Sequence, residues 1–396
     1  MRKSKSGYYL DENRKRSRQR PAGSGRAVAL WVVDVAMVVV TVVAAVALVA
    51  ALLSRVVDPR ATSLFAFAGL FYQVIFVVNV GCALWWIVRW RRWVILSAVA
   101  LLIGWGNIKL FYRSDLQQNP TEVVRSRDDV VVASFNVKGF AGTGVDKGGY
   151  DEVGQLFSRA GVNVACVQEC YYYNEERRDY FYDRLDRLKY RIFVNTVPEQ
   201  KGSPTGGGFA ILSSYPIVRH GVADADESNV NAIWADLRVG RDTLRVVNAH
   251  LQSTGISNVE RNETLTTQVI GDTLARTKLS AVAVKMVDNY RQRASEADNL
   301  ADFVASSPHP VVVCGDFNDT PVSYTYRRVR GRHLADGFVE KGRGTEYTFK
   351  GLYNLFRIDY ILADKEHFEI KEYCSVDSLL TSDHKPVVAR LGLIEE

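Results

Sequence analysis

The sequence predicts a layered α/β sandwich preceded by three transmembrane helices. Three observations lead to this prediction. The first third of the chain contains long, nearly uninterrupted apolar runs, whereas the rest contains short apolar runs bounded by turn residues. Helical patterns lie among the short runs, and no repeat of fixed period occurs. Short strands interspersed with helices are typical of sheets that bury their faces against other layers.

Charge divides the 396-residue chain at the same place. Residues 1–113 carry 16 Lys and Arg against 4 Asp and Glu, so the overall net charge of +6 hides a basic N-terminal third and a mildly acidic remainder. An acidic remainder argues against a domain that grips nucleic acid by bulk charge. The five cysteines form no C-x-x-C pair and no dense framework, which indicates neither a zinc site nor a disulfide scaffold.

The N-terminal third is expected to be a membrane region. We expect residues 1–26 to form a basic, disordered, cytoplasmic tail and residues 27–112 to form three transmembrane helices. A span needs about 20 apolar residues. Runs of roughly that length or longer lie at 27–53, 63–88 and 93–111. A polar linker at 113–128 then leads to a domain at 129–396.

Arginine predicts how these helices cross the membrane. The tail and the short loop 89–92 are both rich in arginine, so the positive-inside rule places both in the cytoplasm. With three spans, the domain at 129–396 then lies outside the cytoplasm. The sequence therefore predicts a multi-pass protein of the cell inner membrane with an extracytoplasmic domain.

Asp34 is a charged residue within the first apolar run. One interpretation gives it a function in the membrane, either on an ion path or as the partner of another helix. The other places it near the cytoplasmic end of the span, where its carboxylate reaches water. We favour the second interpretation.

The domain at 129–396 reads as strands with helices between them. Helices are expected at 150–160 and 175–188 and over most of 258–306. Strands are expected at 130–135, 162–167, 190–195, 207–213, 216–221, 230–238, 243–249, 310–314, 357–363, 367–376 and 386–393.

Strand after strand is bounded by a residue of catalytic type. Each such residue has an ordinary explanation, such as a cap on a turn. Six strand ends that all carry carboxylate, amide or imidazole groups are hard to explain in that way, because ligands gather beyond strand ends, where side chains converge. These residues are Asn136, Glu169, Asn248 with His250, Asp316 with Asn318, Asp359, and Asp383 with His384.

This set of side chains suits a hard divalent cation. Carboxylates and amides with two histidines and no cysteine fit Mg²⁺, or alternatively Mn²⁺, better than structural zinc. The chemistry that such a set supports is phosphoester hydrolysis, in which a metal neutralises the phosphate and a carboxylate aligns the attacking water.

Seven short blocks in the same part of the chain resemble the endonuclease/exonuclease/phosphatase superfamily. That superfamily includes DNase I-like nucleases, neutral sphingomyelinases and inositol-polyphosphate phosphatases. The blocks occur in the family's order and cover about residues 129–393. They are Ser134–Val137, Val167–Glu169, Gly208–Ser213, Val247–Leu251, Gly315–Asp319, Arg357–Ile361 and Ser382–Pro386.

The resemblance implies a four-layer sandwich of two mixed β-sheets flanked by helices, and it implies a role for each site residue. The metal would be held by Glu169, with Asn136 close to metal or phosphate and Asp383 as a direct or indirect ligand. His384 and Asp359 would form a dyad, and Asp316 would orient or activate water. The phosphate would be bound by Asn318 and Asn248 and by His250, which would also assist the leaving group.

Two departures from the family pattern affect these expectations. Lys138 stands where some nuclease members place an acid, so a two-acid metal site on that loop is not expected. The insertion 252–289 is longer than the family pattern predicts. It either shapes a rim or lid over the site or forms surface helices without a role in recognition.

The leading functional hypothesis is a membrane-anchored, Mg²⁺-dependent phosphoesterase. A lipid headgroup or small phosphoester is favoured slightly over nucleic acid, because the domain lacks a basic stripe and the tether favours a substrate at the bilayer. The alternatives are an extracytoplasmic endo- or exonuclease and a catalytically silent binding or scaffold protein. Substrate identity, mono- against diesterase activity, and one against two metal ions stay open at this point.

Overall fold

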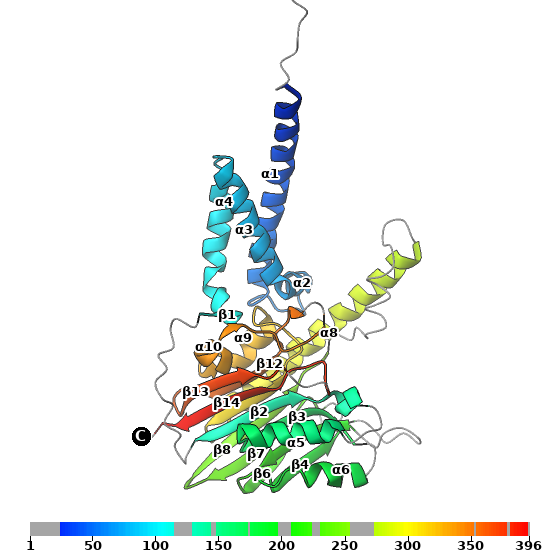
Figure 1. Cartoon of the computed structure of the whole chain (residues 1–396), viewed down its shortest axis with the longest axis vertical. Coiled ribbons are helices and arrows are strands. Elements are labelled where there is room, and N and C mark those ends of the chain that lie inside the picture. Colours follow the sequence, from blue (N-terminus) through cyan, green and yellow to red (C-terminus); the bar gives the residue numbers. More distant parts are fainter. Residues whose placement is uncertain are drawn as a thin grey trace, which may run out of the picture.

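The computed structural model describes residues 24–114, 129–143, 148–172, 175–196, 207–223, 230–253, 273–351, 354–377 and 381–394. The greater part of the expected tail and linker, and residues 254–272 of the insertion, lie outside the described residues. Figure 1 shows a group of helices standing on a sandwich of strands.

Four helices and a short 3-10 helix make up the N-terminal part (Figure 1). Only one described helix is long and apolar enough to cross a membrane by itself, namely Val28–Leu53 within α1. α2 and α3 meet at a bend of 72° and pass the same test only if they are counted as one span. Of the three transmembrane helices that were expected, the structure therefore supports one clear apolar helix. The elements are α1 (Ser24–Leu53), α2 (Leu64–Leu70), α3 (Tyr72–Val88), α4 (Val94–Gly104) and η1 (Trp105–Leu110).

The bend between α2 and α3 has a physical reason in the packing of α2. The ring of Phe67 packs edge-on against Tyr290 of the sandwich, with ring centroids 5.3 Å apart. Gly69 lies so close to the Ser54 side chain that a Cβ there would be 2.2 Å from its Oγ. The start of the second apolar run thus docks on the sandwich instead of extending α3.

α1 and α3 are joined by polar contacts along their length. The Asn79 side chain donates to the Ala44 carbonyl at 2.9 Å. Arg89 and Asp34 form an ion pair, with Nη2 and Oδ2 2.8 Å apart. Asp34 is therefore the partner of another helix, which is the interpretation that we did not favour. The outward side of the helices is apolar, and Val77 and Leu102 are 67% and 74% exposed.

The sandwich contains two six-stranded mixed sheets. The first has the order β13 (Phe368–Ser375), β14 (Val387–Leu393), β2 (Val130–Asn136), β3 (Val164–Tyr171), β5 (Gly207–Ser213) and β4 (Tyr190–Asn195). The second has the order β10 (Leu334–Asp336), β12 (Asp359–Asp364), β9 (Val311–Asp316), β8 (Asp242–His250), β7 (Ala232–Val239) and β6 (Ile217–Val222).

Helices cover the outer faces of both sheets, which confirms the flanked α/β sandwich. α5 (Gly148–Ala160), α6 (Glu175–Tyr182) and η3 (Lys138–Thr143) pack on the first sheet. The second sheet is covered by α8 (Thr273–Ala305) and α9 (Tyr324–Arg330), while α10 (Gly337–Lys341) lies beside β12 and β13. Apolar side chains of both sheets fill the layer between them.

The helices of the N-terminal part share a hydrophobic core with the second sheet. Leu48 and Tyr72 belong to the same buried cluster as Val322 and Tyr326. The Ser54 hydroxyl donates to the Val322 carbonyl at 2.7 Å. The chain then leaves the helices through β1 (Tyr112–Arg113), which pairs antiparallel with β11 (Gly344–Thr345).

Candidate active site

Two pairs of parallel strands bring the site together. β2 runs parallel to β3, and β8 runs parallel to β9, so the carboxyl ends of each pair meet at one edge. Asn136, Glu169, His250 and Asp316 lie at these four ends. Because the two sheets are stacked, the four side chains face one another at this edge of the sandwich.

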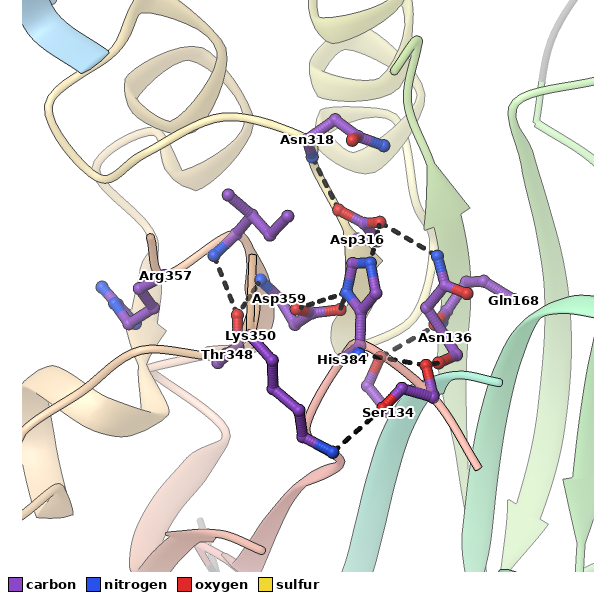
Figure 2. Close-up of polar contacts among 12 residues, drawn as sticks. Ser134, Asn136, Gln168, Asp316, Asn318, Thr348, Lys350, Arg357, Asp359 and His384 are labelled. Atoms are coloured by element: carbon purple, nitrogen blue, oxygen red, sulfur yellow. Dashed lines mark hydrogen bonds and ion pairs between the residues drawn. The ribbon is translucent and has the colours of Figure 1, made fainter. Parts of the chain in front are cut away.

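His384 and Asp359 form a buried pair (Figure 2). His384 Nδ1 lies 3.1 Å from Asp359 Oδ2, and its Nε2 lies 3.7 Å from Asp316 Oδ2. The Thr348 hydroxyl accepts hydrogen bonds from the backbone N–H groups of residues 358 and 359 and so fixes the start of β12. The Phe349 ring packs against the imidazole at a centroid distance of 5.2 Å. The dyad is thus held in one orientation.

Electrostatics favour the charged form of this imidazole. Burial alone would lower the pKa of His384, but the carboxylates of Asp359 and Asp316 outweigh burial and raise its pKa to about 10. Burial raises the pKa of Asp359 to about 6, although the imidazole opposes this shift. Around neutral pH the metal-free pair is therefore an imidazolium beside a carboxylate.

Asn136 connects the two sheets at the centre of the site. Its Nδ2 donates to Glu169 Oε1 at 3.0 Å and to Asp316 Oδ2 at 3.1 Å. Its Oδ1 accepts the backbone N–H of Lys138 at 3.0 Å. The face that Asn136 turns to the carboxylates is therefore its amide nitrogen, which cannot bind a cation. We assign Asn136 to orienting the two carboxylates.

The backbone at Glu169 and Asn318 has an unusual conformation. Both residues have positive φ angles, 49° and 51°, which non-glycine residues adopt at a cost of order 1 kcal/mol. Glu169 sits where the pairing of β3 with β5 shifts register, so its side chain is aimed at the site instead of along the sheet. Such strain is concentrated at functional sites.

The Gly315–Asn318 turn supports Asp316. Gly315 has a φ of 148°, and a Cβ there would lie 1.9 Å from the Ala249 carbonyl oxygen, so only glycine fits. Asp316 Oδ1 accepts the Asn318 N–H at 2.8 Å, which leaves Oδ2 facing the site. The Asn318 side chain donates to the Leu251 carbonyl at 3.0 Å.

His250 supplies an observation that points to a bound group. Its Nε2 is buried and has no hydrogen-bond partner, yet it lies 3.6 Å from Glu169 Oε1 and 3.7 Å from Asp316 Oδ2. The carboxylate oxygens of Glu169 and Asp316 therefore converge on one imidazole, that of His250. The same two oxygens accept from the side-chain amide of Asn136. A hard divalent cation with water ligands fits this arrangement of donors.

A second arrangement of possible ligands lies deeper. Oxygen and nitrogen atoms of Asp316, Asp359 and His384 all lie within 4.8 Å of one another. All three residues are buried, however, and Asp359 is already committed to the imidazole Nδ1. Glu169 is the more accessible carboxylate, with 29% of its side chain exposed. We therefore place the candidate cation beside Glu169 and Asp316.

The structure does not bring Asn248 to the phosphate side of the site. Asn248 is fully buried between the sheets, where its Nδ2 donates to the carbonyls of Val167 and Ala210 and its Oδ1 accepts from Gln168 at 2.7 Å. Each polar atom of its side chain thus has a protein partner. Asn248 holds the two sheets together and has no donor left for a phosphate.

Asp383 lies at the site, but a lysine holds it. Its Oδ2 is 2.5 Å from Lys138 Nζ. The neighbouring Ser382 hydroxyl donates to the Asn136 carbonyl at 2.7 Å and accepts the His384 N–H at 3.0 Å. Sequence reasoning assigned no role to Ser382, Gln168 or Thr348. The first two lie inside the matched blocks, whereas no motif marked Thr348.

The fold and this site define a class of protein, an α/β-sandwich hydrolase whose dyad faces carboxylates across two sheets. The family comparison agrees. Residues 133–384 match the model of the endonuclease/exonuclease/phosphatase family, and the chain belongs to that family. Its members are generally phosphoester hydrolases and typically depend on divalent metals. Residues 34–111 match a domain of unknown function.

Several solved structures are similar to this chain at low sequence identity. The human Nocturnin catalytic domain with bound sulfate is 17% identical, with a TM-score of 0.47 over 67% of this chain and 94% of that one. An endonuclease/exonuclease/phosphatase from Beutenbergia cavernae is 17% identical, with a TM-score of 0.48 over 67% and 72%. An AP endonuclease from Archaeoglobus fulgidus is 17% identical, with a TM-score of 0.44 over 66% and 98%. No curated protein matches the chain.

Proposed function

We propose that the protein is a membrane-anchored, Mg²⁺-dependent phosphoesterase, with Mn²⁺ as the alternative ion. One observation carries the proposal. The unpartnered Nε2 of His250 and the Nδ2 of Asn136 both face Glu169 and Asp316, opposite the buried His384–Asp359 pair. This arrangement leaves a place for a cation. It also offers a carboxylate that can orient water and an imidazolium that can donate a hydrogen bond to a phosphate oxygen.

Each residue near the reaction centre has a task that its contacts suggest. Asp316 orients the attacking water and takes its proton, because Asn318 fixes one of its oxygens and leaves the other directed at the site. His384 donates from Nε2 to a phosphate oxygen, since Asp359 keeps it charged. The cation, when bound beside Glu169, supplies positive charge that neutralises the phosphate.

Asn318 and His250 complete the proposal at the edge of the site. Asn318 contributes to holding phosphate oxygens, and His250 assists the leaving group from the side of Glu169. Asp383 takes part through its lysine partner. Asn248 is not included, because its amide is committed to the sheets.

The position of the helices favours a substrate at the bilayer. Phe71, between α2 and α3, contacts Phe356 at a centroid distance of 6.4 Å. Phe356 and His384 both bridge to Phe349. The base of the membrane anchor is thus three contacts from the dyad, through Phe356 and Phe349. We favour a lipid headgroup or small phosphoester over nucleic acid for this reason and because residues 114–396 are acidic.

We further propose that the domain lies outside the cytoplasm at the inner membrane. Asp34, near the start of α1, pairs with Arg89 at the end of α3, so the start of α1, with Arg26, and the arginine-rich loop 89–92 lie at the same end of the helices. The positive-inside rule assigns that end to the cytoplasm. The sandwich is at the opposite end (Figure 1).

A substrate panel tests the proposed activity. The full chain in detergent, with Mg²⁺ or EDTA, is assayed on bis(p-nitrophenyl) phosphate, a phospholipid, a sugar phosphate and DNA. We expect Mg²⁺-dependent hydrolysis that Glu169→Gln and His384→Ala each lower by about a thousandfold. His367→Ala is the matched control, since this histidine is paired with Asp364 and lies away from the site.

Each outcome of the panel separates the candidate functions. Preference for DNA would favour the extracytoplasmic nuclease over the lipid or small phosphoester. Hydrolysis of no substrate by a folded, Mg²⁺-loaded protein would favour a binding or scaffold protein on this fold. Retention of most activity by either site variant would contradict the assignment of the site.

A further inference from the structure

We propose that the ammonium group of Lys138 serves as a built-in second cation of the site. In this role it holds Asp383 and binds a non-bridging phosphate oxygen, so that the site takes one divalent ion rather than two. This inference rests on the proposed phosphoesterase function. It concerns which groups balance the negative charge of the carboxylates and the phosphate at the site.

The position of Lys138 is the first support. It follows Asn136 by two residues and is held in a left-handed conformation with φ of 46°, as are Gly139 and Phe140 after it. Its backbone N–H fixes the Asn136 amide at 3.0 Å. Its side chain reaches Asp383 Oδ2 at 2.5 Å and is still 37% exposed. The strained turn therefore places the ammonium at the site and keeps it open to a ligand.

The count of charges is the second support. Four carboxylates lie at the site, and a phosphate would add further negative charge. Asp359 is paired with the imidazole of His384 at 3.1 Å, and Asp383 with the ammonium of Lys138 at 2.5 Å. Among the described residues, no lysine or arginine lies within ion-pair distance of Glu169 or Asp316. The imidazole of His250 lies that close to both carboxylates, and that of His384 lies that close to Asp316. Two carboxylates suit one divalent ion.

The chemistry of a lysine at this place is the third support. A second divalent ion would need at least one free carboxylate, and Asp383 is the remaining candidate. Lysine is a compact point charge with three donors, so an ammonium bound to one carboxylate oxygen keeps hydrogens for a phosphate oxygen. The same group thus supplies the positive charge that a second ion would bring to this place.

Metal stoichiometry tests the inference without any substrate. We expect equilibrium dialysis of the full chain against Mn²⁺ to give one bound ion per chain. We expect Lys138→Glu to bind two, because it frees Asp383 and places a second acid beside it. Lys371→Met is the matched control, because Lys371 forms a similar ion pair with Asp129 (2.7 Å) away from the site.

Binding of inorganic phosphate to the Mn²⁺-loaded protein, measured by calorimetry, gives a second readout. We expect Lys138→Met to weaken phosphate affinity at least tenfold, Lys138→Arg to retain part of it, and Lys371→Met to leave it unchanged. Two Mn²⁺ ions in the wild-type chain, or unchanged phosphate affinity in Lys138→Met, would overturn the inference. One ion with no hydrolysis of any phosphoester would instead overturn the proposed function.

Discussion

Glu346 is a buried carboxyl group outside the site. Its side chain is 5% exposed, and its Oε1 accepts from the Tyr373 hydroxyl at 3.3 Å. Burial raises its pKa to about 7, although Arg357 opposes the shift. The folded protein therefore holds a proton on Glu346 at pH values where the unfolded chain has released it.

The free energy of unfolding should depend on this proton. Because the folded pKa is above the unfolded value of 4.5, stability is lost as pH rises from about 4.5 to about 7, and stays level above that. The loss is roughly 3 kcal/mol at most. We expect Glu346→Gln to match the wild-type Tm at pH 4.5 and to exceed it by roughly 5 °C at pH 8.

Thermal melts of the full chain from pH 4.5 to pH 8.5 measure this effect. Glu340→Gln is the control, because Glu340 is exposed on α10 and should show the same pH profile as the wild type. A constant Tm difference between Glu346→Gln and wild type at all pH values would contradict the assignment of the raised pKa to Glu346.

Single residues also show how far the sequence could predict the site. The dyad and the four strand ends follow from motifs, because side chains at the ends of parallel strands must converge. Asn248 belongs to the same sequence motif as His250, but it lies two residues earlier on the same face of β8. Two residues of strand place it about 6.6 Å deeper, between the sheets. Sequence alone does not state that depth.

At the scale of elements, the strands were easier to predict than the helices. Short, buried strands such as β2 and β9 begin with three valines and end in a polar residue, so their boundaries are visible. The short helices α9 and α10 were missed, since five to seven residues give too little periodicity. The break at Phe71 was missed because it depends on contacts with a part of the chain over 200 residues away.

Removing the helices should therefore damage the sandwich. Leu48 and Tyr72 bury Val322 and Tyr326 of the sandwich in one cluster. We expect the fragment 114–396 to aggregate, or to melt at least 10 °C below the full chain in detergent, because this apolar surface becomes exposed.

A fragment that starts at Ser24 is the control for this truncation. It lacks only the residues before α1 and should keep the Tm of the full chain. A soluble 114–396 fragment with unchanged Tm would show that the shared core does not stabilise the sandwich.

At the scale of the whole molecule, the direction of the chain across the membrane can be tested with one thiol. Cys374 is the exposed cysteine, and Cys82, Cys166, Cys170 and Cys314 are buried. We expect a membrane-impermeant maleimide, added to spheroplasts of a bacterial expression host, to label Cys374 of the protein. Cys374→Ser should remove this labelling. Labelling only after the membrane is permeabilised would place the sandwich in the cytoplasm.

The double attachment of the sandwich has a consequence for how the protein meets its substrate. Ser54 on one side and the β1–β11 pair on the other fasten the sandwich to the helices. Under the proposed membrane anchoring and hydrolase activity, a sandwich fastened in this way cannot swing on a tether, so its catalytic centre would keep a constant height above the lipid surface. Encounters with a lipid substrate would then depend on how many target molecules occupy each unit area of that surface, and lateral diffusion in two dimensions would replace diffusion through the surrounding solution.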